Sequence, residues 1–128
     1  MIQISLDYKA GIFSLHSSGH ADQGADTRKG FNLVCAAVTA LIKTFELSIT
    51  ALCERKPSQH EEEPGHLKVS WEKIFGEDFN HGGELRENST KKHTLLVLVR
   101  SLQIGLEVIN QSYPGNISVR YRLHEFRF

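Results

Sequence analysis

The chain has 128 residues, with 15 Lys and Arg against 15 Asp and Glu, seven His and two Cys. This zero formal net charge argues against a general nucleic-acid binder, because non-specific affinity for a polyanion depends on an excess of basic side chains. Two cysteines are too few for a disulfide-stapled scaffold or a four-thiolate zinc site. The composition therefore predicts one globular domain over residues 1–128.

In the first half of the chain, the spacing of apolar side chains changes from every second residue, which is typical of a strand, to every third or fourth residue, which is typical of a helix. Residues 2–8 and 12–17 alternate between apolar and polar side chains, which predicts two strands joined by a short turn. Residues 21–31 contain glycines and charges without an apolar run, which indicates a mobile loop. From residue 33 apolar side chains recur every three or four positions, so we expect a helix of about 20 residues with Asn32 as its N-cap.

The second half repeats this change of period. We expect a solvated connection over 54–65, a strand over 67–71, a polar excursion at about 76–88, a helix over 90–111 and a last strand over 117–123. The predicted order is β-β-α-β-α-β, which is an α+β domain with a small sheet packed on two amphipathic helices. In the first helix, Lys43, Glu46 and Thr50 are predicted to face away from the core.

The sequence predicts neither a secretory signal nor a membrane span. The first residues lack the basic flank and apolar run of a secretory signal. The uninterrupted apolar stretches are far shorter than the roughly 20 residues of a membrane span. We therefore expect a cytoplasmic protein with reduced thiols.

Cys35 has two interpretations. Three residues after a cap at Asn32, its thiol lies in the first turn of the helix, where unbonded N–H groups and the helix dipole favour an anion and lower the pKa of a thiol. It can equally be a small apolar residue that fills space beside Ala36. Cys53 ends the same helix and is interpreted as structural. About 27 Å along the helix axis separates the two cysteines, which is too far for a disulfide.

His20 is the candidate base for Cys35. It follows the second strand, and the next loop returns the chain to the helix start, so an imidazole there can accept the thiol proton. His16 is a weaker second candidate, and a solvent-exposed role for His20 stays open. A metal site made of His16, His20 and Cys35 lacks the paired short spacings of structural zinc sites. No nucleotide-binding glycine motif is present, so we expect no metal and no cofactor.

The sequence resembles the ribosomal-processing cysteine protease (Prp) family. Gly19-His20-Ala21 matches its Gly-His-Ala triplet, and the segment Asn-Leu-Val-Cys-Ala-Ala-Val-Thr at 32–39 is similar to its Asp-Ile-Val-Cys-Ala-Ala-Val-Ser. Residues 105–109 and Tyr113-Pro114 are similar to the family's second helix and its exit. The resemblance covers most of the chain outside 76–88.

This resemblance implies a cytoplasmic bacterial endopeptidase that acts as a homodimer. It implies Cys35 as the nucleophile and His20 as the general base and acid. The implied substrate is the N-terminal extension of a large-subunit ribosomal protein. The zero net charge predicts that this substrate is recognised as a peptide segment, without direct binding of nucleic acid. The loop from Asp22 to Phe31 is implied to order over that substrate. For the oxyanion we expect backbone N–H groups at the helix start, those of Cys35 and Ala36.

Three departures separate the chain from the family pattern. Asn32 replaces the usual Asp, Thr39 replaces Ser, and the loop between His20 and Cys35 is about three residues longer. Asn32 can still cap a helix, and Thr39 keeps the hydroxyl while adding a methyl group. The departures leave open a non-catalytic ribosome-associated binding or assembly factor of the same fold. A thiol-transfer protein is a third possibility, which would need an external thiol because Cys53 is distant.

Overall fold

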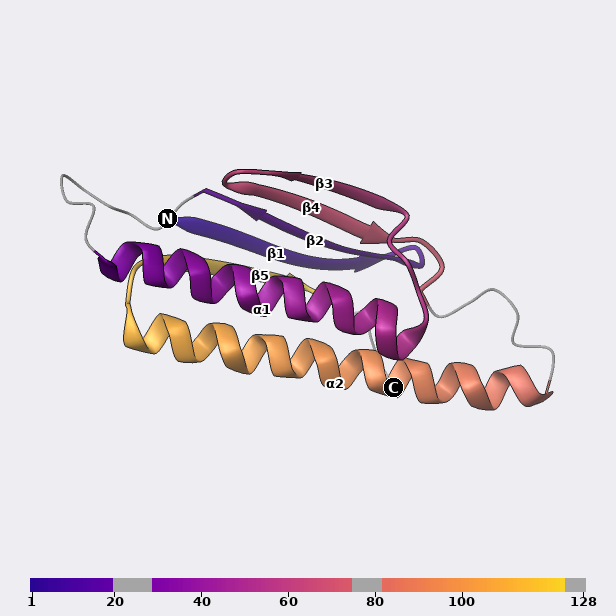
Figure 1. Cartoon of the computed structure of the whole chain (residues 1–128). Coiled ribbons are helices and arrows are strands. Elements are labelled where there is room, and N and C mark those ends of the chain that lie inside the picture. Colours follow the sequence, from indigo (N-terminus) through magenta and orange to yellow (C-terminus); the bar gives the residue numbers. More distant parts are fainter. Residues whose placement is uncertain (20–28, 75–81, 124–128) are drawn as a thin grey trace.

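The computed structural model describes residues 1–19, 29–74 and 82–123, with side chains at 1–19, 33–74 and 90–123. Five strands and two helices follow one another along this part of the chain (Figure 1). They are β1 (Ile2–Lys9), β2 (Ile12–Ser18), α1 (Lys29–Cys53), β3 (Gln59–Glu63), β4 (His66–Trp71), α2 (Gly82–Ser112) and β5 (Ile117–Arg122). Both helices lie side by side on one face of the sheet (Figure 1), which confirms the predicted α+β class.

The sheet has the strand order β3-β4-β2-β1-β5. Three of its four pairings are antiparallel, and only β1 and β5 run parallel. The parallel pair aligns Ile2 with Ile117, and the Ile2 N–H donates to the Asn116 carbonyl oxygen at 2.9 Å. β1, the first strand, is therefore held in the sheet by β5, the last described strand.

The core lies between the sheet and the helix pair. Alternate residues of the strands face the helices, as the period of two predicts, and the helical stripes meet them. Three rings form its centre: Phe13 of β2 lies 5.9 Å from Trp71 of β4 and 5.9 Å from Phe45 of α1, between ring centroids. The helices add buried aliphatic side chains, from α1 Val34, Val38, Ile42 and Ile49 and from α2 Leu95, Val99, Leu102, Leu106 and Ile109.

A strand that the sequence did not predict lies within the expected connection. The segment 54–65 contains β3 (Gln59–Glu63), which pairs antiparallel with β4. All five of its residues are exposed at the edge of the sheet, so they show no apolar alternation to detect. Its strand conformation comes from pairing with β4, and its row of charges is typical of edge strands protected against further pairing.

Both helices begin earlier than predicted. α2 starts at Gly82, eight residues before the expected start, so residues 82–88 of the expected polar excursion are helical. The first turns of α2 carry no apolar stripe, which is why the periodicity missed them. α1 starts at Lys29, so residues 29–31 of the expected loop are helical and Asn32 lies inside the helix. The prediction of Asn32 as N-cap is therefore wrong in this structure. The remainder of both segments, 21–28 and 76–81, lies outside the described residues.

One segment of α1 has the length and apolarity of a membrane span. Leu33–Cys53 covers 21 residues with a mean hydropathy of 1.6. The same segment supplies a row of core side chains, from Val34 to Cys53, that pack with the residues of the sheet and of α2. In this fold the segment therefore serves as a core helix.

Candidate active site

A groove of about 490 Å³ lies between α1 and the hairpin formed by β3 and β4. One wall is the α1 face from Cys35 to Lys43, and the other is the hairpin turn from Glu62 to Leu67. Ile2, Ser17 and Gly19 close it at the end of the sheet. Its surface is apolar near Val38 and Ile42 and polar at the rim.

Cys35 lines this groove and is half-buried. Thr39, one helical turn further on, is exposed and lines the same groove. Because α1 begins at Lys29, Cys35 is its seventh residue and lies in the second turn. Only the first four N–H groups of a helix lack an intrahelical acceptor, so the structure gives no support to the N–H groups of Cys35 and Ala36 as oxyanion donors. The helix dipole also acts less strongly on the Cys35 thiol in the second turn than it would in the first.

His20 lies outside the described residues, but its neighbour Gly19 lies at the groove. Gly19 has a φ of +96°, and its N–H donates to the carbonyl oxygen of Gly65 at 2.9 Å. This bond joins the end of β2 to the hairpin turn that forms the far wall. The backbone that leads into His20 is therefore fixed beside the groove that contains Cys35.

We expect Gly19→Ala to be strongly destabilising. A Cβ at Gly19 would overlap the backbone carbonyl oxygen of Met1, whereas Gly115, with a φ of +83°, has no atom within 4 Å of its added Cβ. Gly115→Ala is the matched control, because it carries the cost of a positive φ alone, about 1 kcal/mol. Gly19→Ala should lose at least about 2 kcal/mol more in urea unfolding. Equal losses in the two variants would contradict the steric argument.

His16, the second candidate base, does not line the groove. Its Nε2 lies 3.4 Å from Nδ1 of His66, with ring centroids 5.0 Å apart. His66 does line the groove, although the sequence assigned it no role. Burial, followed by the charges of His66 and Lys68, lowers the pKa of His16 below its usual 6.5. The structure therefore does not bring His16 and Cys35 together as a metal site or as a catalytic pair.

The lowered pKa of His16 predicts a loss of stability in mild acid. As the pH falls below about 6.5, the unfolded chain takes up a proton at His16 before the folded chain does, so the free energy of unfolding falls until the pH passes the folded pKa. His16→Gln should therefore show a smaller decrease in Tm between pH 7 and pH 5 than the wild type. His93→Gln, an exposed histidine of α2, is the control. A decrease as steep in His16→Gln as in the wild type would refute this.

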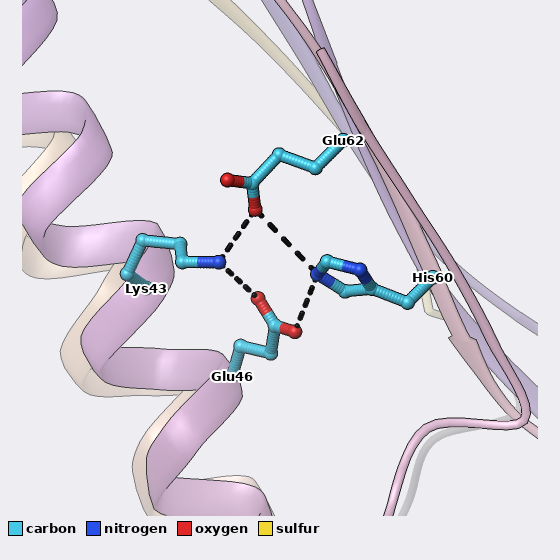
Figure 2. Close-up of polar contacts among 4 residues, drawn as sticks. All are labelled: Lys43, Glu46, His60 and Glu62. Carbon is cyan, nitrogen blue, oxygen red and sulfur yellow. Dashed lines mark hydrogen bonds and ion pairs between the residues drawn. The ribbon is translucent and has the colours of Figure 1, made fainter.

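Figure 2 shows a polar cluster of Lys43, Glu46, His60 and Glu62. Two of its members, Lys43 and Glu62, line the groove at the end away from the sheet edge formed by Ile2, Ser17 and Gly19. Glu46 of α1 is only 6% exposed, so the prediction that it faces away from the core is wrong. Its Oε1 lies 3.0 Å from His60 Nε2 and its Oε2 lies 3.5 Å from Lys43 Nζ. Glu62 contacts both Lys43 and His60. The hydrogen bond between Lys43 and Glu62 raises the pKa of Lys43 and lowers that of Glu62.

The ligand types of this cluster would also suit a divalent cation. Atoms of Glu46, His60 and Glu62 all lie within 4.8 Å of one another. The Lys43 ammonium, however, contacts both carboxylates and neutralises one of their two negative charges. The sequence could not indicate this cluster, because its members come from α1 and from a strand without an apolar pattern.

The chain thus combines an α+β fold with a groove that a free thiol lines. A family profile described as "Cysteine protease Prp" matches residues 1–118, and the chain is a member of this family of cysteine proteases. No curated protein is detectably similar in sequence.

Solved structures share the fold at low sequence identity. The ribosomal processing protease Prp from Staphylococcus aureus, in complex with a covalently linked product peptide, is 21% identical, covers 95% of this chain and 100% of its own, and has a TM-score of 0.62. The same protease in complex with a substrate peptide is 18% identical over the same shares, with a TM-score of 0.65. SMU.848 from Streptococcus mutans is 21% identical, covers 95% of this chain and 94% of its own, and has a TM-score of 0.61.

Proposed function

We propose that this cysteine protease removes the N-terminal extension of a bacterial large-subunit ribosomal protein. The observation that carries the proposal is the thiol of Cys35 in a groove of about 490 Å³, a size that accepts a few residues of an extended peptide. The peptide complexes of the S. aureus ribosomal processing protease support it. The zero net charge favours recognition of a peptide segment over direct binding of nucleic acid.

In the proposed reaction Cys35 is the nucleophile and His20 is the general base and acid. His20 takes the thiol proton, and the thiolate attacks the scissile carbonyl to form a tetrahedral oxyanion. The C–N bond then breaks as His20 protonates the leaving amine, which leaves a thioester on Cys35. A water molecule, deprotonated by His20, hydrolyses the thioester and restores the thiol. The fixed backbone at Gly19 supports this pairing, because it anchors the residue before His20 at the groove.

The experiment that tests this function is cleavage of the ribosomal protein with and without its extension. The purified chain should cut the extended form once, at the junction with the mature protein, and leave the mature form intact, as read by mass spectrometry. Tight binding of the extension without any cleavage would favour the non-catalytic assembly factor of the same fold. Rapid consumption of peroxide by Cys35 would instead favour the thiol-transfer protein.

We further propose that the protein works in the cytoplasm as a homodimer. A substrate that belongs to the ribosome supports the compartment. The outer surface of the helix pair supports self-association, since it exposes large apolar side chains that a monomer leaves in water: Leu47, Leu52, Val97, Ile104 and Val108. A dimeric mass by light scattering that falls to a monomeric mass in Ile104→Glu is the expected result.

A further inference from the structure

The edge strand β3 has no apolar anchor to the rest of the molecule. All five of its residues are exposed, and its backbone pairs with β4 on one side only. The turn that follows it, from Glu63 to His66, forms the wall of the groove opposite Cys35. The partner strand β4 is anchored by its pairing with β2 and by the buried Leu67 and Val69. The position of β3 against α1 therefore depends on its pairing with β4 and on polar contacts.

Besides the strand pairings of β4 with β2 and β3, two polar contacts join the hairpin to the rest of the molecule, one at each end of the groove. At the sheet end, the Gly65 carbonyl oxygen accepts the hydrogen bond of the Gly19 N–H. At the far end, the cluster of Lys43, Glu46, His60 and Glu62 joins α1 to β3 (Figure 2). We name these four residues the clasp.

Glu46 is the centre of the clasp. Its carboxylate is the only charged side chain classed as buried in the described part of the chain, and burial of a charge is unfavourable unless the charge is paired. Its Oε1 lies within hydrogen-bond distance of His60 from β3, whereas its buried Oε2 forms an ion pair with Lys43 of its own helix without a hydrogen bond. Lys43 in turn contacts Glu62, which lines the groove together with Lys43. The buried carboxylate thus contacts β3 through His60 and, through Lys43, the two charged side chains that line this end of the groove.

We propose that Glu46 is a positioning residue for peptide binding. Through His60 and Lys43 it holds β3 against α1 and so sets the width of the groove beside Cys35. It touches neither the reacting atoms nor the thiol, and it acts on the affinity for the peptide and not on the chemical step. The link to peptide binding rests on the proposed function, whereas the link to the groove wall does not.

The test compares Glu46→Gln and His60→Gln with the matched control Glu61→Gln. Glutamine keeps the shape of Glu46 and removes its charge. His60→Gln acts from an exposed position and is informative even where Glu46→Gln folds poorly. Glu61 lies between His60 and Glu62 on β3, carries the same charge as Glu62 and makes none of the clasp contacts.

Two measurements report on the position of the groove wall and require no peptide cleavage. Amide hydrogen exchange of β3 should become at least tenfold faster in both clasp variants, while the amides of β1 and β2 keep their rates. For Cys35, the rate constant with a bulky maleimide divided by the rate constant with iodoacetamide should rise at least threefold over the wild type. Unchanged β3 exchange, or an equal increase in β1 and β2, would overturn the proposal, since the second result indicates only a general loss of stability.

The third readout follows the peptide. KM for the extended peptide should rise about tenfold in the clasp variants, with kcat within twofold of the wild type and no change in Glu61→Gln. A fall in kcat at constant KM would overturn the positioning role. If the wild type cleaves no peptide, the proposed function fails, and the exchange rates and the reagent ratio decide whether the clasp sets the groove.

Discussion

Cys35→Ala is expected to lose peptide cleavage by at least about a thousandfold in kcat, because no other nucleophile replaces the thiolate that we propose to form the thioester. The variant should retain its fold, since Cys35 is only half-buried and alanine fits the helix. Cleavage of the extended substrate, followed by mass spectrometry, measures the loss.

Cys53→Ala is the matched control, because Cys53 is the second thiol of the same helix. Cys53 is 1% exposed and lies in the core, and burial raises the pKa of its thiol, which keeps it protonated at neutral pH. This variant should keep full activity and lose about 1 kcal/mol of stability. Iodoacetamide should label Cys35 in the native protein and leave Cys53 unmodified. Cleavage by Cys35→Ala at the wild-type rate would contradict the assignment of the nucleophile.

Trp71→Ala is expected to produce a large loss of stability, about 3–5 kcal/mol in the free energy of unfolding. Trp71 is 1% exposed, and its ring lies 5.9 Å from Phe13 and 6.4 Å from Phe45 between centroids. Its removal leaves a cavity where the sheet meets α1. Urea unfolding followed by circular dichroism measures the loss.

Trp71→Phe separates packing from polarity at the same position. The buried Nε1–H of Trp71 has no hydrogen-bond partner, and phenylalanine removes this unsatisfied donor while it keeps an aromatic ring. We expect a loss below about 1.5 kcal/mol, since the gain from removing an unpaired group offsets part of the lost volume. Similar losses in both variants would refute the role of ring packing.

The sequence predicted the elements whose pattern comes from burial on one face. β1 alternates Ile2, Ile4 and Leu6 against polar neighbours, and these three side chains are buried. β3 has no such alternation, because an exposed edge strand is stabilised only by its pairing with β4. The early turns of α2 were missed for a related reason, since the apolar stripe begins only at Leu95.

The residues of the site likewise fall into those that a local sequence pattern indicates and those that it does not. Cys35 and Gly19-His20 were indicated by a local motif, and the structure places Cys35 and Gly19 along one groove. The opposite wall comes from residues 62–67, which reach the groove only through strand pairing. Glu46 was predicted to be exposed because a glutamate within a helix is usually solvated. Its burial depends on His60, a partner that no helical period could reveal.

The parallel pair of β1 and β5 has a consequence for how the chain acquires its shape. β1 lies second from one edge of the sheet and gains one of its two neighbours from residues more than a hundred positions later. The hairpin of β1 and β2 can form from local sequence, but the ladder with β5 requires closure of nearly the whole chain, which is entropically slow. Until Ile117–Arg122 has been synthesised, β1 offers an unpaired edge. Ile2 lies on that strand and also lines the groove, so the sheet end of the groove reaches its final form only after β5 has paired with β1.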